Sequence, residues 1–229
     1  LLVRTGLNEC SCRIRENGRT EAVKILPELS HLVDLPQQKN FHKFDGWYHT
    51  LAVVHAAPPT LLLRWAALLH EVGKGMPGVR RIKDGKYTDY GHDLKGAEMA
   101  AEIFRRWRFP AAFAKRVVWL VENHMRYHYF ANVPEANVEK WLRQLARGKQ
   151  FSSSADMKEG IGELTALCNA DIIGCGKDEN ATEGHSSFGK YMEELCQMMP
   201  VSAKDLRYDR RVIDALRPAV ADGMANLLF

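Results

Sequence analysis

Apolar residues recur with a helical period along most of the chain. The clearest stripe is Leu61, Trp65, Leu68 and Leu69, which lie on one helix face and follow Thr60, a favourable N-cap residue. Similar periodicity, with capping and breaking residues, predicts the helices Gly46–Ala57 (capped by Asp45), His92–Trp107, Ala111 to about His124, Val138–Ala146, Ser153 or Ser154 to Ile173, and Ser187–Met199.

Less regular segments lie between and around these helices. We expect a short helix over Glu21–Leu35 that breaks at Pro27, and two short helices at Asp209–Leu216 and Val220–Leu228. Residues 37–44 and 75–91 read as loops. No stretch shows the sustained alternation of a half-buried strand, and no internal repeat is visible. The pattern therefore predicts an all-α helical bundle.

Composition adds few restrictions. Of 229 residues, 46% are hydrophobic and 26% are charged, which is typical of a globular protein and not of a disordered one. The net charge of +4 suits a phosphate-bearing partner without demanding nucleic acid. We expect no membrane span and no signal peptide, although the first residue is Leu and an upstream segment can be missing. Five cysteines without a CxxC pair favour reduced thiols in the cytoplasm and do not predict a thiol metal site.

Candidate chemistry begins at the end of the apolar helix, where His70 and Glu71 precede the helix breaker Gly73. Titratable groups at the buried end of a helix are costly unless they are paired or bind a metal ion. Lys74 follows, and its ammonium group can reach back to an anion in the same space.

Further residues with metal-ligand chemistry occupy apolar or terminal positions of other predicted helices. Each has a simpler interpretation, such as a capping group, a surface imidazole or a solvated carboxylate. Their number on separate helices favours a metal site over those interpretations. They are His49, His92, His124 and Asp171.

The order of these residues resembles the HD superfamily of metal-dependent phosphohydrolases. In that family a His precedes a His-Asp doublet and a distant Asp; the doublet here is His70-Glu71. The segments Leu26-Pro-Glu-Leu29, His42-Lys-Phe-Asp45, His49-Thr-Leu51, Trp65-Ala-Ala-Leu-Leu-His70, Gly91-His92 and Val201–Leu206 further resemble the HD region in the C-terminal part of bacterial tRNA nucleotidyltransferases, the CCA-adding and poly(A)-polymerase-like family. The Gly-Gly/Gly-Ser signature and paired Asp ligands of the nucleotidyltransferase head are absent from the sequence, so nucleotide addition by this chain alone is not expected.

The resemblance implies an organisation and a set of site residues. It implies an N-terminal helical arm over residues 1–40, a metal-binding HD core over 41–180, and a C-terminal helical tail over 181–229 packed on the core. The metal ligands implied are His49, His70, Glu71 and Asp171, with His92 and His124 added for a second ion. Catalytic roles fall to Glu71 as a bridge and to Lys74, with Arg80 and Arg81 beside Lys74 for the substrate phosphate.

The implied cofactor is one or two divalent ions. Imidazole and carboxylate ligands suit Mn, Fe, Ni, Co or Zn, and suit Mg less well. The implied substrates are phosphomonoesters or 2′,3′-cyclic phosphodiesters of nucleotides or RNA ends. We also expect that Glu71, one methylene longer than Asp, keeps the first ion but weakens the second.

Two other functions stay open. The chain can be a non-catalytic RNA-binding module that recognises tRNA by shape and charge, or a degenerate HD domain in which Glu71 marks lost activity. Asp45 is expected to cap its helix, and a second interpretation is that its carboxylate orients the His49 imidazole. No role is predicted for five of the nine histidines, namely His31, His42, His55, His128 and His185.

Overall fold

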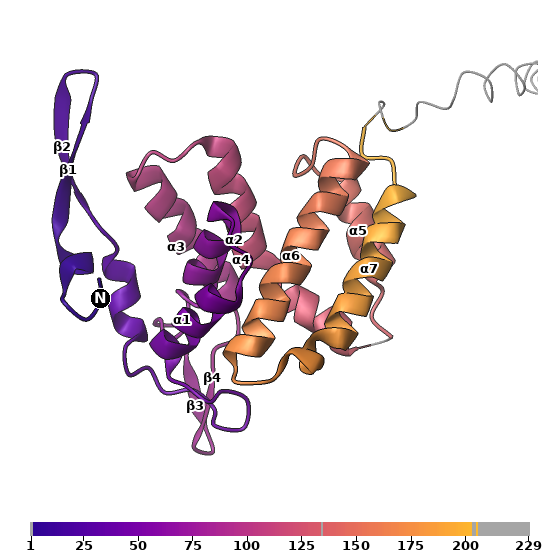
Figure 1. Ribbon diagram of the computed structural model, residues 1–229, viewed down its shortest axis with the longest axis horizontal. Coiled ribbons are helices and arrows are strands. Elements are labelled where there is room, and N and C mark those ends of the chain that lie inside the picture. Colours follow the sequence, from indigo (N-terminus) through magenta and orange to yellow (C-terminus); the bar gives the residue numbers. More distant parts are fainter. Residues whose placement is uncertain (1, 134, 203–204, 206–229) are drawn as a thin grey trace, which may run out of the picture.

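The computed structural model describes residues 2–133, 135–202 and 205, and most of these residues are helical (Figure 1). The all-α expectation is confirmed, although two small hairpins accompany the helices. The α-helices are α1 (Gly46–Ala56), α2 (Leu61–Leu69), α3 (His92–Arg106), α4 (Ala111–Asn132), α5 (Val138–Arg147), α6 (Ser154–Gly174) and α7 (Glu183–Gln197). Short 3-10 helices are η1 (Leu7–Glu9), η2 (Pro27–Leu32) and η3 (Glu179–Thr182). The helices expected at Asp209–Leu216 and Val220–Leu228 lie outside the described residues.

Side-chain caps fix where several helices begin. Asp45 Oδ1 accepts a hydrogen bond from the Tyr48 N–H at 2.7 Å at the start of α1. Thr60 caps α2 in the same way through its hydroxyl oxygen, and Ser153 caps α6. Since such caps are local in sequence, the predicted starts of these helices agree with the structure.

The N-terminal segment departs from prediction. Strands β1 (Ser11–Glu16) and β2 (Arg19–Lys24) pair antiparallel, so the predicted helix over Glu21–Leu35 is wrong and a strand followed by η2 takes its place. Asn17 and Gly18 form the turn with φ of 49° and 76°. Two successive residues with positive φ suit the tight turn of a twisted hairpin, and Asn-Gly is the preferred pair there.

Two further differences lie near the candidate site. Within the expected loop over residues 75–91, strands β3 (Arg81–Lys83) and β4 (Lys86–Thr88) form a second hairpin. Helix α4 continues to Asn132. His124 therefore lies inside this helix, whereas the sequence prediction placed it at the helix end. The sequence holds no Gly or Pro between Pro110 and Pro134, and nothing therefore stops the helix at His124.

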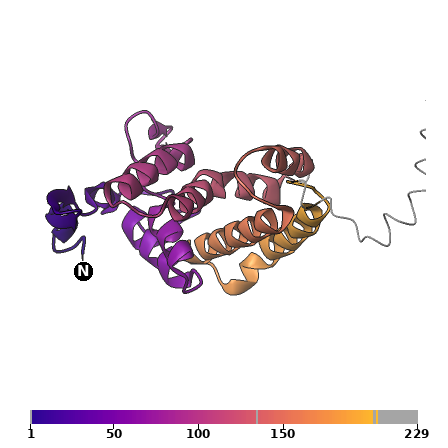
Figure 2. The same cartoon turned by 90° about the horizontal axis from the view of Figure 1, so that it is seen from above.

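The core forms around α6, which packs against α1, α2, α4 and α7. Helices α6 and α7 lie side by side in both views (Figure 1 and Figure 2). A Cβ atom at Gly174 would lie 2.3 Å from the Val53 side chain, so the last turn of α6 approaches α1 more closely than any other residue would allow. No helix among the described residues is long and apolar enough to cross a membrane.

Candidate metal centre

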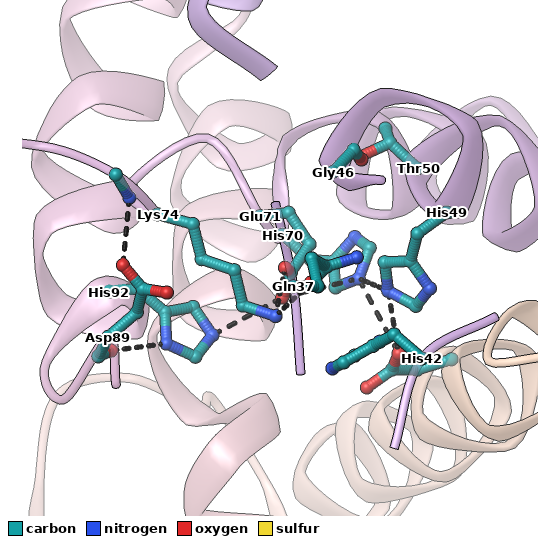
Figure 3. A network of polar contacts seen from close by, with 12 residues as sticks. Gln37, His42, Gly46, His49, Thr50, His70, Glu71, Lys74, Asp89 and His92 are labelled. Carbon is teal, nitrogen blue, oxygen red and sulfur yellow. Dashed lines mark hydrogen bonds and ion pairs between the residues drawn. The ribbon is translucent and has the colours of Figure 1, made fainter. Parts of the chain in front are cut away.

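Side chains from five parts of the chain converge where α1, α2, α3, α4 and α6 meet. His49 lies on α1, His70 and Glu71 follow α2, His92 begins α3, His124 lies within α4 and Asp171 lies near the end of α6. The four imidazoles and Glu71 are buried. Figure 3 shows several of these side chains pointing toward one another. The structure thus brings together all six residues expected to bind metal ions.

The first ligand group is His49, His70 and Asp171. The Nε2 atoms of His49 and His70 lie 3.3 Å apart, and each faces Asp171 Oδ1, at 3.1 and 3.7 Å respectively. Ligand atoms that lie this close together can share one cation.

The second ligand group is Glu71, His92 and His124. The two imidazole Nε2 atoms lie 3.1 Å apart, and Glu71 Oε1 lies 3.3 Å from His92 Nε2 and 4.0 Å from His124 Nε2. The same oxygen lies 3.7 Å from His70 Nε2 in the first group. Glu71 therefore stands between the groups but is nearer to the second, whereas the expected first set of ligands included it.

Backbone carbonyls orient three of the imidazoles. The Nδ1 atoms of His70, His92 and His124 each contact the carbonyl oxygen three residues earlier, at 2.6 to 2.8 Å. Since a carbonyl only accepts, each Nδ1 carries the proton, and a neutral ring then presents a bare Nε2. Bare Nε2 atoms that face another nitrogen or a carboxylate require a proton or a cation between them. The donor set therefore fits a divalent metal ion, with the hydrogen-bonded imidazoles typical of metal sites.

The electrostatics of the cluster point the same way. Burial alone would raise the carboxyl pKa values, but the ammonium of Lys74 and the neighbouring imidazoles hold the pKa of Glu71 well below its ordinary value. Burial lowers the pKa of His49, yet Asp171 outweighs this effect and raises it to about 10. Burial beside other imidazoles holds the pKa of His124 well below its usual range. Burial also opposes ionisation of Asp171, but hydrogen bonds from His128, His49 and His70 hold its pKa well below its ordinary value. The centre thus contains two ionised carboxylates, which favour a bound cation.

The comparisons with known proteins agree with this geometry. Residues 47–157 match the HD domain family. This part of the chain is an HD domain. The resemblance seen in the sequence is confirmed, and HD domains bind divalent metal ions. Asp171 lies beyond the matched range, on the helix that completes the first ligand group.

The chain is similar to an A-adding tRNA nucleotidyltransferase and to multifunctional CCA proteins. The chain is 39% identical over 105 residues to the A-adding tRNA nucleotidyltransferase of Deinococcus radiodurans, which covers 44% of this chain and 24% of the relative. It is 27% identical over 188 residues to the multifunctional CCA protein of Actinobacillus pleuropneumoniae, and the aligned part covers 78% of this chain and 43% of that relative. For the multifunctional CCA protein of Aromatoleum aromaticum the values are 31% over 135 residues, covering 56% and 32%. The chain thus spans less than half the length of each of these relatives.

The basic residues expected near the HD ligands have different surroundings. Lys74 is buried; its ammonium pairs with the Glu71 carboxylate and donates to Gln37 Oε1 at 2.8 Å. Arg80 forms a two-point ion pair with Asp89, at 3.0 and 2.8 Å. Arg81 is exposed on β3. Of the three residues expected to contact a substrate phosphate, Lys74 is the one that the structure places beside the ligand groups.

Three histidines without a predicted role lie at the HD centre. His128, one turn beyond His124 on α4, places Nε2 3.0 Å from Asp171 Oδ2 and Nδ1 3.1 Å from His185 Nε2. It therefore holds the carboxylate whose other oxygen faces the first ligand group. A predicted helix that continued past His124 would have indicated this role, because the i,i+4 spacing of His124 and His128 puts both side chains on one helix face.

The third of these histidines, His42, lies beside His49 with the two rings edge to face, at a centroid separation of 4.8 Å. Asp45 has no contact with the His49 imidazole; its carboxylate is used by the helix cap and by the Asp34 N–H. The suggestion that Asp45 orients His49 is therefore wrong.

Proposed function

We propose that this HD domain is a metal-dependent phosphohydrolase that acts on phosphomonoester or 2′,3′-cyclic phosphodiester groups of nucleotides or RNA ends. The supporting observation is the pair of adjoining ligand groups, in which four imidazole Nε2 atoms and two carboxylates face one buried space. Such mixed nitrogen and oxygen donors suit Mn, Fe, Co, Ni or Zn.

A cavity of about 280 Å³ opens beside these groups and supports a small substrate. Lys74 and His92, which both contact Glu71, line it together with Phe41, Tyr87 and Tyr90. A cation suits a phosphate, and aromatic rings suit a nucleobase by stacking. The volume lies near the lower limit for ligand pockets and thus fits a single nucleotide or one terminal residue of an RNA.

The site residues would have separate roles in metal binding and phosphate binding. His49, His70 and Asp171 would hold one ion, and Glu71, His92 and His124 a second. A bound ion would lower the pKa of a water molecule and stabilise charge on a phosphoryl oxygen. Lys74 would hold a non-reacting phosphate oxygen, since it lines the cavity and its ammonium can donate to an anion while it remains paired with Glu71. Because the Arg80 guanidinium already forms an ion pair with Asp89, Arg80 would not bind the phosphate. It would instead stabilise the wall of the cavity, where it stacks on the Tyr87 ring.

The decisive experiment measures metal content and hydrolysis together. Wild type, His70→Ala and His55→Ala are purified in parallel, and each is assayed with a 2′,3′-cyclic nucleotide and a phosphomonoester in the presence of Mn²⁺, Co²⁺ or Ni²⁺. His55 is exposed at the end of α1 and serves as the matched control. We expect His55→Ala to behave as wild type and His70→Ala to lose bound metal and at least about 100-fold in rate, as loss of a metal ligand implies.

Negligible metal in all three proteins, or wild type that binds metal but hydrolyses neither substrate, would refute the proposed function. In the second case a tRNA-binding role is the next candidate, favoured by the relative whose name refers to tRNA. It would show as tRNA binding by metal-free protein with a steep dependence on salt.

A further inference from the structure

A third group of ligand atoms shares His49 with the HD ligands and adds two residues that are not among them. His42, in the loop before α1, and Cys175, directly after α6, lie beside His49. We propose that His42, His49 and Cys175 form a separate thiolate-containing site for a soft divalent cation of the zinc class. The site uses the second nitrogen of His49, and occupying it withdraws His49 from the first HD ligand group.

The geometry of this third group suits such an ion. Cys175 Sγ lies 3.4 Å from His42 Nδ1, and the ligand atoms of the three residues all lie within 4.8 Å of one another. Zinc bound tetrahedrally at typical Zn–N and Zn–S lengths places its nitrogen and sulfur ligands about 3.6 Å apart. The observed N–S separation is therefore close to what a single ion requires.

An independent observation is the unused nitrogen of His49. The side chain is 0% exposed, yet Nδ1 has no hydrogen-bond partner within the described part of the chain. A buried imidazole nitrogen without a partner is costly, and the cost is removed by a ligand. Since ligand atoms of His42 and Cys175 lie within 4.8 Å of a His49 ring nitrogen, the ligand that this chemistry selects is a metal ion.

The two nitrogens of His49 make its two uses alternatives. A proton on Nε2 can be donated to Asp171 Oδ1, 3.1 Å away, and this leaves the Nδ1 lone pair for Cys175 and His42. A proton on Nδ1 leaves Nε2 for the HD centre. A neutral imidazole has one proton, so an ion at either site favours the tautomer that weakens the other site.

The backbone holds the third group together and leaves it reachable. The Lys43 N–H donates to the Cys175 carbonyl at 3.3 Å, which ties the loop carrying His42 to the end of α6. Gly176 turns the chain away with a φ of +86°, where a side chain would also press on Lys43. His42 and Cys175 are both partly exposed, so a cation can enter from solvent. His42 also lines the proposed substrate cavity.

Cobalt(II) provides the direct test, because thiolate ligation gives a charge-transfer band that imidazole and carboxylate ligands do not give. Metal-free protein comprising residues 1–229 is titrated with Co²⁺ as wild type, Cys175→Ser, His42→Gln and Cys10→Ser. Cys10 is an exposed control thiol. The band should appear in wild type and Cys10→Ser, disappear in Cys175→Ser, and weaken at least about 10-fold in apparent affinity in His42→Gln. No band in wild type, or a band that persists in Cys175→Ser, overturns the site.

The proposed function and the third site fail separately in this design. The band should survive in His70→Ala, which damages the HD centre alone, and its loss there would overturn a separate site. The competition for His49 rests on the proposed HD metal centre. Zn²⁺ also competes directly for the HD ligands, so one equivalent of Zn²⁺ should weaken Mn²⁺ binding in both proteins, but at least about 10-fold more in wild type than in Cys175→Ser. Equal weakening in both would overturn the competition.

Discussion

Gly73 is the point at which the chain after α2 touches the first turn of α3, and Gly73→Ala tests whether this approach positions the second ligand group. A Cβ atom at Gly73 would lie 2.2 Å from the His92 carbonyl oxygen and 2.6 Å from the Gly96 nitrogen. Both are backbone atoms, so no side-chain rotation relieves the overlap. The segment after α2 must move away from α3 by about 1 Å to restore ordinary contact.

The size of the effect follows from these distances. Overpacking of a well-packed interior typically costs about 1–3 kcal/mol. Since the clash at Gly73 is with backbone, we expect a value at the upper end, near 3 kcal/mol. In a chain of this length each kcal/mol lowers the melting temperature by about 2–4 °C, so the expected fall is roughly 6–12 °C. Glu71 Oε1, now 3.3 Å from His92 Nε2, should also move out of reach of the second group.

Thermal unfolding in EDTA and metal stoichiometry measure the two effects independently. The matched control is Gly184→Ala, because a Cβ atom there meets nothing within 4 Å and the residue lies in α7. The control should be neutral or slightly stabilised, since Ala favours a helix. Should Gly73→Ala melt within about 2 °C of wild type and bind the same number of ions, the close approach does not position Glu71.

Three further substitutions test other contacts. Burial opposes ionisation of Asp89, but the hydrogen bond from Arg80 holds its pKa below the ordinary value. In urea unfolding, Asp89→Asn should therefore be less stable than wild type by about 1.5–3 kcal/mol above roughly pH 4. This difference should vanish as the pH falls through the lowered pKa, and the exposed control Asp84→Asn should be unaffected. Tyr127→Phe removes the hydroxyl that donates to the His185 carbonyl at 2.6 Å and should cost about 1 kcal/mol, whereas the exposed Tyr129→Phe should not change the melting temperature. Leu164→Ala empties a fully buried position in α6 and should cost about 2–5 kcal/mol by the same assay, unlike Leu61→Ala at a position that is 66% exposed.

Helix starts could be predicted from sequence because caps are local. Asp45, Thr60 and Ser153 each satisfy the N–H group three residues on, so the residue type and its position are sufficient. The hairpins also had a local signal, in Asn17-Gly18 and Asp84-Gly85. These turn pairs alone do not predict strands, because the flanking segments are short and mostly exposed. Without a buried face, such strands lack the alternation of apolar and polar residues that identifies a strand in sequence.

The contacts within the candidate metal centre, in contrast, have no local sequence signal. Ligand types could be recognised along the chain, but their neighbours could not, since His128 meets Asp171 across 43 residues and His42 meets Cys175 across 133. These pairs exist because helices pack at particular distances. Nothing in the local pattern reports those distances, and the same holds for the pairing of Lys74 with Glu71 and Gln37.

Two glycines set the distances on which the two ligand groups depend. Gly73 allows the chain after Glu71 to reach the start of α3, and Gly174, three residues after Asp171, allows α6 to reach Val53, four residues after His49. Gly174→Ala should therefore separate His49 from Asp171 and weaken the first ion, whereas Gly73→Ala should weaken the second. Metal titration of both variants distinguishes this from general destabilisation, which would weaken both ions in both proteins. If each variant instead loses both ions together, these glycines do not position the two ligand groups separately, and the prediction is refuted.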